Sequence, residues 1–299
     1  MENKFKVAAL YILVCLIWGT TWFAIRISLN DLTPFLSAGI RFIVASVIIY
    51  IIMLIKGYKL QLDKIAVRLY LVMGFFSFMI PFGLVYWGEQ FVPSGLAAVL
   101  FGVYPFFIAL FSYFFLKSDK IGLFKILGML LGFGGIVIIF SDQFQGDLSI
   151  YFWGMLAIVL SGFMQAVVAV GVKKYGHHIN PLTINFIPMA ITGIFMTPIA
   201  LLIEDTSHLN FSQEAILSIL FLALFGSVIS FSSYYWLLKR INIVVLSIVA
   251  FITPIIALMV GWIFNNEILY FNHILGSIFV LLGLLTANIG TMKFSFKRA

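Results

Sequence analysis

The chain has 299 residues, of which 63% are hydrophobic and only 10% are charged, with a formal net charge of +7. An ordinary soluble domain carries roughly 25% charged residues, and 18 basic plus 11 acidic side chains cannot cover the surface of a soluble protein of this length. The composition excludes a soluble enzyme, a disordered chain and a disulfide-rich secreted domain, and it predicts an integral membrane protein.

Ten apolar stretches follow one another along the chain. A helix needs about 20 residues to cross the roughly 30 Å of hydrocarbon in a bilayer. The stretches are too long for barrel strands and lack period-two alternation, so we expect helices. They cover residues 7–29, 33–55, 67–90, 93–116, 121–141, 151–172, 181–203, 214–238, 242–264 and 270–291. The sequence therefore predicts an all-α integral membrane protein with ten transmembrane helices.

The first stretch has Lys4 and Lys6 before it, as a signal peptide would. It is as long as a membrane span and has no small-x-small cleavage site at its end. We therefore expect this first helix to be retained.

The basic residues indicate the direction of the helices. Of the 18 Lys and Arg residues, all except Arg26 and Arg41, hence sixteen, fall in segments that are cytoplasmic if the N-terminus is cytoplasmic. Lys and Arg near membrane helices concentrate on that side. The sequence thus predicts a multi-pass protein of the plasma membrane with both termini in the cytoplasm. The net charge reflects this topology and contact with anionic lipid, not a nucleic-acid partner.

The two halves of the chain share a weak repeat. Arg26-x7-Pro34 matches Lys173-x7-Pro181 at an offset of 147 residues. Matches at offsets of 148 or 149 follow in the same order: Tyr86-Trp87 with Tyr235-Trp236, Pro105 with Pro254, and Asp119, Gly128 and Gly135 with Glu267, Gly276 and Gly283. Five helices per half would insert the second repeat, residues 146–299, upside down relative to the first, residues 1–145. Inverted repeats are typical of secondary transporters. The alternative is that the matches arise from chance alignment of apolar helices.

Several motifs resemble the EamA group of the drug/metabolite transporter superfamily. They are Trp18-Gly19-Thr20-Thr21-Trp22, Pro34 with Arg41-Phe42, Tyr104-Pro105, Thr253-Pro254, and the Asn266-Glu267-Ile268-Leu269 turn before a Gly-x6-Gly helix. The resemblance covers the whole chain as two EamA repeats. It implies a ten-helix inverted-repeat carrier, often an exporter of amino acids or other small metabolites. The first repeat departs from the family at Lys117-Ser118-Asp119, where a Gly-Glu-like pair is usual.

Arg41 lies about eight residues, hence about 12 Å, into the second helix. An arginine at that depth costs several kcal/mol unless it faces protein or water and is paired. Two interpretations remain open. Arg41 either provides the counter-charge for an anionic group of a substrate, or it forms a fixed pair or hydrogen-bond fork that locks the second helix against its neighbours.

Aromatic and polar residues inside the helices are candidates for a substrate cavity. Trp18 and Trp22 lie one helical turn apart with Thr21 between them, although Trp normally prefers the membrane interfaces. Ring faces with polar tips bind apolar or cationic groups. The alternative is that the rings only pack and that the polar groups bond their own helix. The candidate cavity residues are Trp18, Thr21, Trp22, Arg41, Tyr86, Tyr104, Gln165, Ser233 and Tyr234.

Two prolines and three acids are candidates for moving parts. Pro105 and Pro254 interrupt their helices and act either as hinges or as static kinks. Glu89 either exchanges a proton during transport or caps its helix at the outer surface. Asp119 and Glu267 either act as gates at opposite faces or cap helix N-termini.

The sequence contains no G-x4-G-K-[ST], no H-E-x-x-H and no G-x-S-x-G motif. We expect no cofactor, no metal and no enzymatic activity. The leading hypothesis is a secondary transporter that exports a small organic metabolite, such as an amino acid, by alternating access. The alternatives are a drug or toxic-compound carrier of the same fold, a lipid-modifying membrane enzyme and a channel. The glycines of the fifth and tenth helices predict close helix contacts, either within the subunit or in a homodimer.

Overall fold

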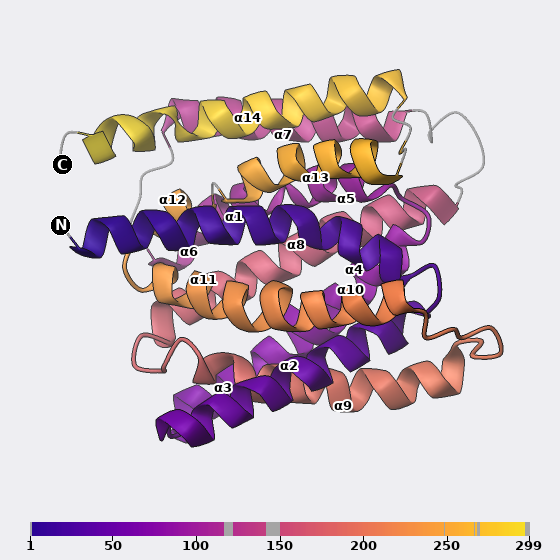
Figure 1. Cartoon of the computed structure of the whole chain (residues 1–299). Helices are drawn as coiled ribbons and strands as arrows, with labels where there is room; N and C mark the ends of the chain where they lie inside the picture. The colour runs from indigo at the N-terminus through magenta and orange to yellow at the C-terminus, as the bar shows by residue number, and fades with distance from the viewer. Residues whose placement is uncertain are drawn as a thin grey trace.

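The computed structural model describes residues 2–116, 122–141, 150–247, 249–265, 267 and 270–296. All regular elements in these ranges are helical. Figure 1 shows the helices lying roughly side by side in a bundle. The predicted repeat boundary at residues 145–146 and the candidate gate Asp119 lie outside the described residues.

Within these ranges the bundle contains ten helical runs, which matches the ten helices that the sequence predicts. Eight of them are long and apolar enough to cross a membrane, and two shorter apolar segments lie within α7 and α14. In chain order the runs are α1 (Glu2–Ser28), α2 (Pro34–Lys56), α3–η1–α4 (Lys64–Met73, Gly74–Met79, Ile80–Glu89), α5–α6 (Ser94–Phe101, Tyr104–Leu116), α7 (Leu123–Phe140), α8 (Ile150–Tyr175), η3–α9 (Thr183–Asn185, Phe186–Ile203), α10–η4–α11 (Gln213–Ala223, Leu224–Ile229, Ser230–Leu238), α12–α13 (Ile243–Ser247, Val249–Asn265) and α14 (Phe271–Phe296).

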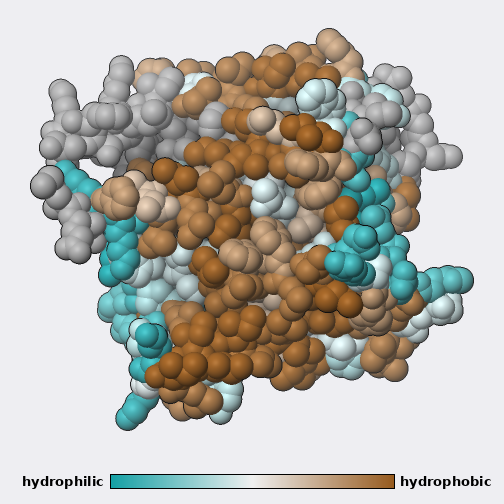
Figure 2. All heavy atoms as spheres, in the orientation of Figure 1, coloured by the Kyte–Doolittle hydropathy of each residue, from teal (hydrophilic) through white to brown (hydrophobic). Residues whose placement is uncertain are grey.

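The outside of the bundle is apolar around its middle. Figure 2 shows hydrophobic residues covering the central part of the molecule and hydrophilic residues gathered at its two ends. Large apolar side chains such as Leu202 (83% exposed), Ile55 (76%) and Trp262 (71%) point outward. Apolar surface of this extent belongs in a bilayer and not in water.

Both ends of the helical chain lie at one face of the bundle. The start of α1 and the end of α14 are at the same side in Figure 1. We call this side the termini face; it also carries the connections 57–63, 176–182 and 239–242. The opposite face carries the connections 29–33, 90–93 and 204–212.

Helix packing follows the inverted repeat. α1 packs against α13 in the second half, and α8 packs against α5 and α6 in the first. In the same way α4 packs against α8, while α10 and α11 pack against α1. Each contact thus has a counterpart with the two halves exchanged, which is the pattern of two inverted five-helix repeats.

Glycines allow the last helices of the two repeats, α7 and α14, to approach closely. A Cβ atom on Gly135 would lie 2.5 Å from the carbonyl oxygen of Gly276, and a Cβ on Gly276 would lie 2.5 Å from the carbonyl oxygen of Gly135. Gly283 faces Gly128 in the same way. Small residues are needed where helix backbones come this near, so these glycines serve contacts within one chain.

The third helix of each repeat contains a π-helical segment at its centre. These are η1 in the first repeat and η4 in the second, each six residues long. Their first residues, Gly74 and Leu224, are 150 positions apart. π-Helical turns are rare and occur frequently at functional sites. The sequence analysis did not predict them.

The fourth helix of the first repeat is broken between Phe101 and Tyr104. Its counterpart in the second repeat, like the first, carries a proline. Pro105 is the second residue of α6, where a proline fits well, and Pro254 lies inside α13. A proline lacks the N–H that would bond the carbonyl four residues earlier, here that of Phe101 and of Ala250.

Candidate functional site

A cavity of about 90 Å³ lies at the centre of the bundle, between the two repeats. Its walls come from the first, second, third, fourth, sixth, eighth and ninth helical runs. Seven of the nine candidate cavity residues line it: Trp18, Thr21, Trp22, Arg41, Tyr104, Gln165 and Tyr234. Tyr86 and Ser233 are buried but do not line it.

The cavity also has wall residues that the sequence analysis did not select. Ser77 comes from η1, Ser247 from α12 and Thr253 from α13. Phe101 and Ala250, whose carbonyls face the two prolines along their helices, line it as well. The break before α6, the part of α13 next to Pro254 and the π-helical segment η1 therefore meet at the cavity.

Trp18 forms one wall with residues of the second repeat. Its indole Nε1 donates a hydrogen bond to Ser230 Oγ at 2.9 Å. Its ring lies 5.2 Å from the ring of Phe231 and 5.2 Å from that of Tyr234. Because the polar edge of the indole is bonded and its faces are packed, the ring is held as a fixed part of the wall.

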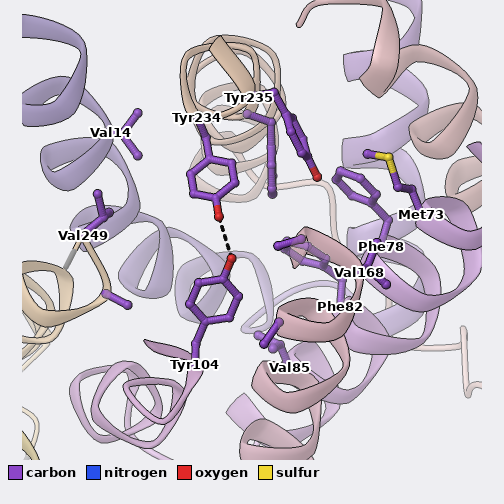
Figure 3. Packing of buried hydrophobic residues seen from close by; sticks show 14 of the residues in the cluster. Val14, Met73, Phe78, Phe82, Val85, Tyr104, Val168, Tyr234, Tyr235 and Val249 are labelled. Carbon is purple, nitrogen blue, oxygen red and sulfur yellow. Dashed lines mark hydrogen bonds between the residues drawn. The ribbon is translucent and has the colours of Figure 1, made fainter. Parts of the chain in front are cut away.

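Tyr104 and Tyr234 join the two repeats across the cavity. Their hydroxyl oxygens are 2.6 Å apart, and either can donate the hydrogen bond. Figure 3 shows the two rings pointing toward each other, one from α6 and one from α11. On the α6 side, Phe101 stacks on Tyr104 at 5.6 Å and contacts Trp22 at 5.5 Å.

Arg41 is only 2% exposed and reaches into the same cavity. Its Nε donates to Ser227 Oγ at 2.9 Å, and Nη1 donates to the hydroxyl of Tyr86 at 3.2 Å. Its Nη2 donates to the carbonyl of Gly226 at 3.1 Å. Gly226 and Ser227 belong to η4, so the π-helical segment supplies two of the three acceptors for this guanidinium.

Nothing in the described part of the chain forms an ion pair with Arg41. Its hydrogen-bond acceptors are neutral, and the rings of Phe42 and Phe82 lie 5.0 Å and 4.9 Å from its guanidinium carbon. A buried charge without a counter-ion is costly. The hydrogen-bond fork expected if Arg41 locks the second helix against its neighbours is therefore present. The positive charge needed to bind an anionic group of a substrate also remains, without a counter-ion, at the cavity wall.

Glu89 is the last residue of α4 and is fully buried. Neither carboxylate oxygen has a hydrogen-bond partner among the described residues. The interpretation of Glu89 as a cap at the membrane surface is therefore wrong. The capping cation is Arg26, whose Nη1 donates to the carbonyls of Glu89 and Gln90 at the end of α4.

Glu267 caps a helix other than its own. It accepts hydrogen bonds from Ser94 N at 2.9 Å, Ser94 Oγ at 2.5 Å and Gly95 N at 3.0 Å, at the start of α5. Glu204 caps the start of α2 in the same way, through Phe35 N at 2.9 Å and Leu36 N at 3.3 Å. Both carboxylates complement helix N-termini and tie the second repeat to the first at the opposite face.

Two related side-chain contacts, one at each face, also link the repeats. At the termini face His178 Nε2 lies 3.0 Å from Asp63 Oδ2. At the opposite face Ser212 Oγ donates to Asp31. The two contacts occupy equivalent positions of the two repeats. Asp31 corresponds to His178 at an offset of 147 residues, and Asp63 corresponds to Ser212 at an offset of 149. Asp63 and Ser212 each cap the third helix of their repeat.

A model of a known protein family matches each half of the chain. The family described as "EamA-like transporter family" matches residues 5–141 and again residues 152–289. These matches cover both halves of the bundle that surrounds the cavity.

Curated proteins of similar sequence carry transporter names. An "Uncharacterized transporter" of Buchnera aphidicola subsp. Schizaphis graminum is 30% identical over 85% of this chain and 85% of its own. "Uncharacterized transporter YoaV" of Bacillus subtilis is 26% identical over 93% of this chain and 95% of its own. "Uncharacterized inner membrane transporter YedA" of Escherichia coli K12 is 29% identical over 87% and 82%, respectively.

A solved crystal structure has the same fold. It superposes with a TM-score of 0.72 at 16% identity, covering 96% of this chain and 98% of that one. At this identity the likeness concerns the fold alone.

Proposed function

The chain belongs to the EamA-like transporter family, and we propose that it is a secondary transporter that exports a small organic metabolite by alternating access. The substrate binds in the central cavity, and the two repeats rock to expose it to each face in turn. The termini face is the cytoplasmic side in this proposal, because sixteen of the 18 Lys and Arg residues belong there by the sequence count.

The observation that carries this proposal is an unneutralised arginine in a cavity at the seam between two inverted repeats. In inverted-repeat carriers the substrate binds near the midplane at that seam, beside broken helices. Arg41 offers charge to an anionic group such as a carboxylate, and Trp18, Trp22 and Tyr104 offer apolar ring surface. An amino acid or a related carboxylate matches this combination.

The cavity is small in this state. About 90 Å³ is well below the roughly 300–1,000 Å³ of a typical small-molecule site. Separation of the tyrosine pair Tyr104–Tyr234 enlarges the cavity and lets substrate enter. We assign the hinges to the helix break beside Pro105 and to Pro254 within α13.

The acids have separate roles in this proposal. Glu89, buried and unpaired in the described part of the chain, is the group for proton coupling. Glu267, which holds the start of α5, is the gate at the opposite face. Asp119 is the corresponding gate at the termini face.

The experiment has two stages. Comparing metabolites exported by cells with and without the gene identifies the substrate. Purified protein in liposomes must then show saturable uptake of that compound and faster uptake when unlabelled compound is present inside. Trp18→Ala abolishes this exchange, whereas Trp262→Ala, at a lipid-facing tryptophan 71% exposed, leaves it intact.

Other outcomes point to other functions. Downhill flux that never saturates contradicts a carrier and favours a channel. Export restricted to cationic or uncharged toxic compounds contradicts the anionic substrate and favours a drug carrier of the same fold.

A further inference from the structure

A second pocket, of about 300 Å³, opens at the termini face. It lies between the end of α8, the loop that follows and the end of α11. Three of its wall residues carry or can carry positive charge: Lys173, His177 and Lys239. No Asp or Glu lines it among the described residues.

The two lysines are held in place by backbone carbonyls. Lys173 Nζ donates to the carbonyls of Leu238 and Ile241. Lys239 Nζ donates to the carbonyls of His177 and Ile179. An ammonium group has three N–H donors, so each lysine keeps one donor for a ligand.

The positive charge of this pocket is not neutralised by the protein. Neither lysine forms an ion pair within the described ranges, and the acid on the neighbouring loop, Asp63, is engaged by His178. Burial, and then the charge of Arg240, lower the pKa of the Lys239 ammonium group. An anion in the pocket would relieve this repulsion.

Tyr235 lies between this pocket and the central cavity. Among the described residues it is the one side chain that lines both. It is 4% exposed, and its ring stands at 84° to that of Tyr234, the next residue of α11. Figure 3 shows the two rings diverging from the same helix. On the other side of Tyr235 lies the central cavity. In the described part of the chain, Arg41 is the one charged side chain that lines this cavity.

We propose that this pocket is a vestibule that binds the anionic group of a small organic acid and passes it to the central cavity. Lys173 and Lys239 hold the carboxylate or phosphate, Tyr235 is the gate, and Arg41 is the next cation along the route. This inference rests on the proposed transport function and adds to it the charge of the substrate and the path it takes. The competing occupant of the same chemistry is the headgroup of an anionic lipid.

The charge of the vestibule is measured without knowing the substrate. In a Cys15→Ser background, His177→Cys places a reactive thiol at the pocket wall. In phosphatidylcholine nanodiscs, its reaction rate with an anionic methanethiosulfonate is compared with that of a cationic one. We expect the anionic reagent to be favoured, and Lys173→Gln with Lys239→Gln to lower this preference roughly fivefold.

A matched control removes the same charge elsewhere on that face. Lys59→Gln with Lys64→Gln, two exposed lysines outside the pocket, should leave the preference at His177→Cys nearly unchanged. If both double variants lose the preference for the anionic reagent equally, the vestibule proposal is overturned. The preference would then arise from the net charge of the whole face and not from the pocket. Phosphatidylglycerol in the nanodisc repels the anionic reagent from the whole face, so a cysteine at Tyr58, outside the pocket, is the reference. A clearly larger slowing at His177→Cys than at Tyr58→Cys overturns the vestibule in favour of a lipid site.

The gate is tested from inside the central cavity. Ser247→Cys places a thiol on that cavity's wall but not in the vestibule. Tyr235→Ala should speed its reaction with the anionic reagent several-fold, whereas Tyr235→Phe, which keeps the ring, should not. If Tyr235→Ala has no effect, the two pockets are not connected and the proposal fails.

Failure here is distinguishable from failure of the proposed function. Saturable exchange in liposomes combined with no charge preference at His177→Cys rejects the vestibule and retains the carrier. Absence of exchange rejects the carrier whatever the labelling rates show.

Discussion

The hydroxyl groups of Tyr104 and Tyr234 lie 2.6 Å apart and join the first repeat to the second inside the membrane. This hydrogen bond crosses the cavity between α6, which begins directly after a helix break, and α11, which follows a π-helical segment. The two helices it connects thus each adjoin an irregular segment where the backbone is least constrained by regular hydrogen bonding.

The first prediction concerns this tyrosine pair. Tyr104→Phe or Tyr234→Phe leaves the partner hydroxyl buried and unpaired, which should lower the free energy of unfolding by about 1–3 kcal/mol. The double variant removes both hydroxyls, so its loss should be smaller than the sum of the single losses. Denaturation in detergent measures all three variants. Strictly additive losses would show that the two hydroxyls are not coupled.

Arg41 gives the second prediction. Arg41→Gln should weaken the affinity of an anionic substrate roughly 10- to 100-fold, because a hydrogen bond to a charged group contributes about 1.5–3 kcal/mol. Ser227→Ala is the matched control, since it removes the acceptor of the Nε donor but keeps the charge. It should change affinity much less. Unchanged KM in Arg41→Gln, with the protein folded, would show that Arg41 only braces the helices.

The third prediction concerns proton coupling. Glu89→Gln keeps the shape of the buried side chain and removes its ability to release a proton. We expect proton-driven net transport in liposomes to be lost while exchange of labelled for unlabelled substrate persists. A variant that retains both activities would remove Glu89 from the mechanism.

The fourth prediction concerns pH and the loop contact between Asp63 and His178. The hydrogen bond from the Ala66 amide, and then the one from His178, lower the pKa of Asp63 below its usual value of 3.8. The stabilisation from the charged carboxylate is therefore complete at neutral pH and is lost only as the pH falls through this lowered pKa. Asp63→Asn should lower Tm at pH 7, and the difference from the wild type should vanish below the pKa of Asp63.

Asp205→Asn serves as the control for that measurement. Hydrogen bonds from Ser207 lower the pKa of Asp205 as well, but these bonds stay within one loop and do not join the repeats. This variant should change Tm less than Asp63→Asn at pH 7. The reverse order would mean that the contact with His178 adds no stability.

The fifth prediction concerns topology. In the Cys15→Ser background, a cysteine at Ser207 on the opposite face should react with an impermeant maleimide added to intact cells. A cysteine at Tyr58 on the termini face, 43% exposed in the wild type, should react only after the membrane is opened. The opposite pattern would invert the orientation of every helix.

The helices could be predicted from the sequence because the bilayer imposes a simple rule on it. Each span needs about 20 apolar residues, and the breaks between spans carry the charged residues. Many of the cavity residues could also be predicted from the sequence. An aromatic or polar side chain in the middle of a span, such as Trp18 or Gln165, has few reasons to face lipid.

Tertiary contacts explain what the sequence analysis missed. Ser77 and Ser227 are buried and lie in π-helical segments, which have no sequence pattern of their own. Glu267 stands before α14, and one of its two interpretations was a cap of that helix, yet it caps α5. One of the two interpretations of Glu89 placed it at the surface because it ends a helix, whereas the packing of its neighbours buries it.

The central claim is that one cavity between the two repeats opens to each face in turn. Thr21 lines that cavity and is 7% exposed. In the Cys15→Ser background, Thr21→Cys should react with an impermeant thiol reagent added to either side, in right-side-out and in inside-out vesicles, and transported substrate should slow both reactions. Reaction from one side alone, under every condition of substrate and pH, would contradict alternating access at this cavity.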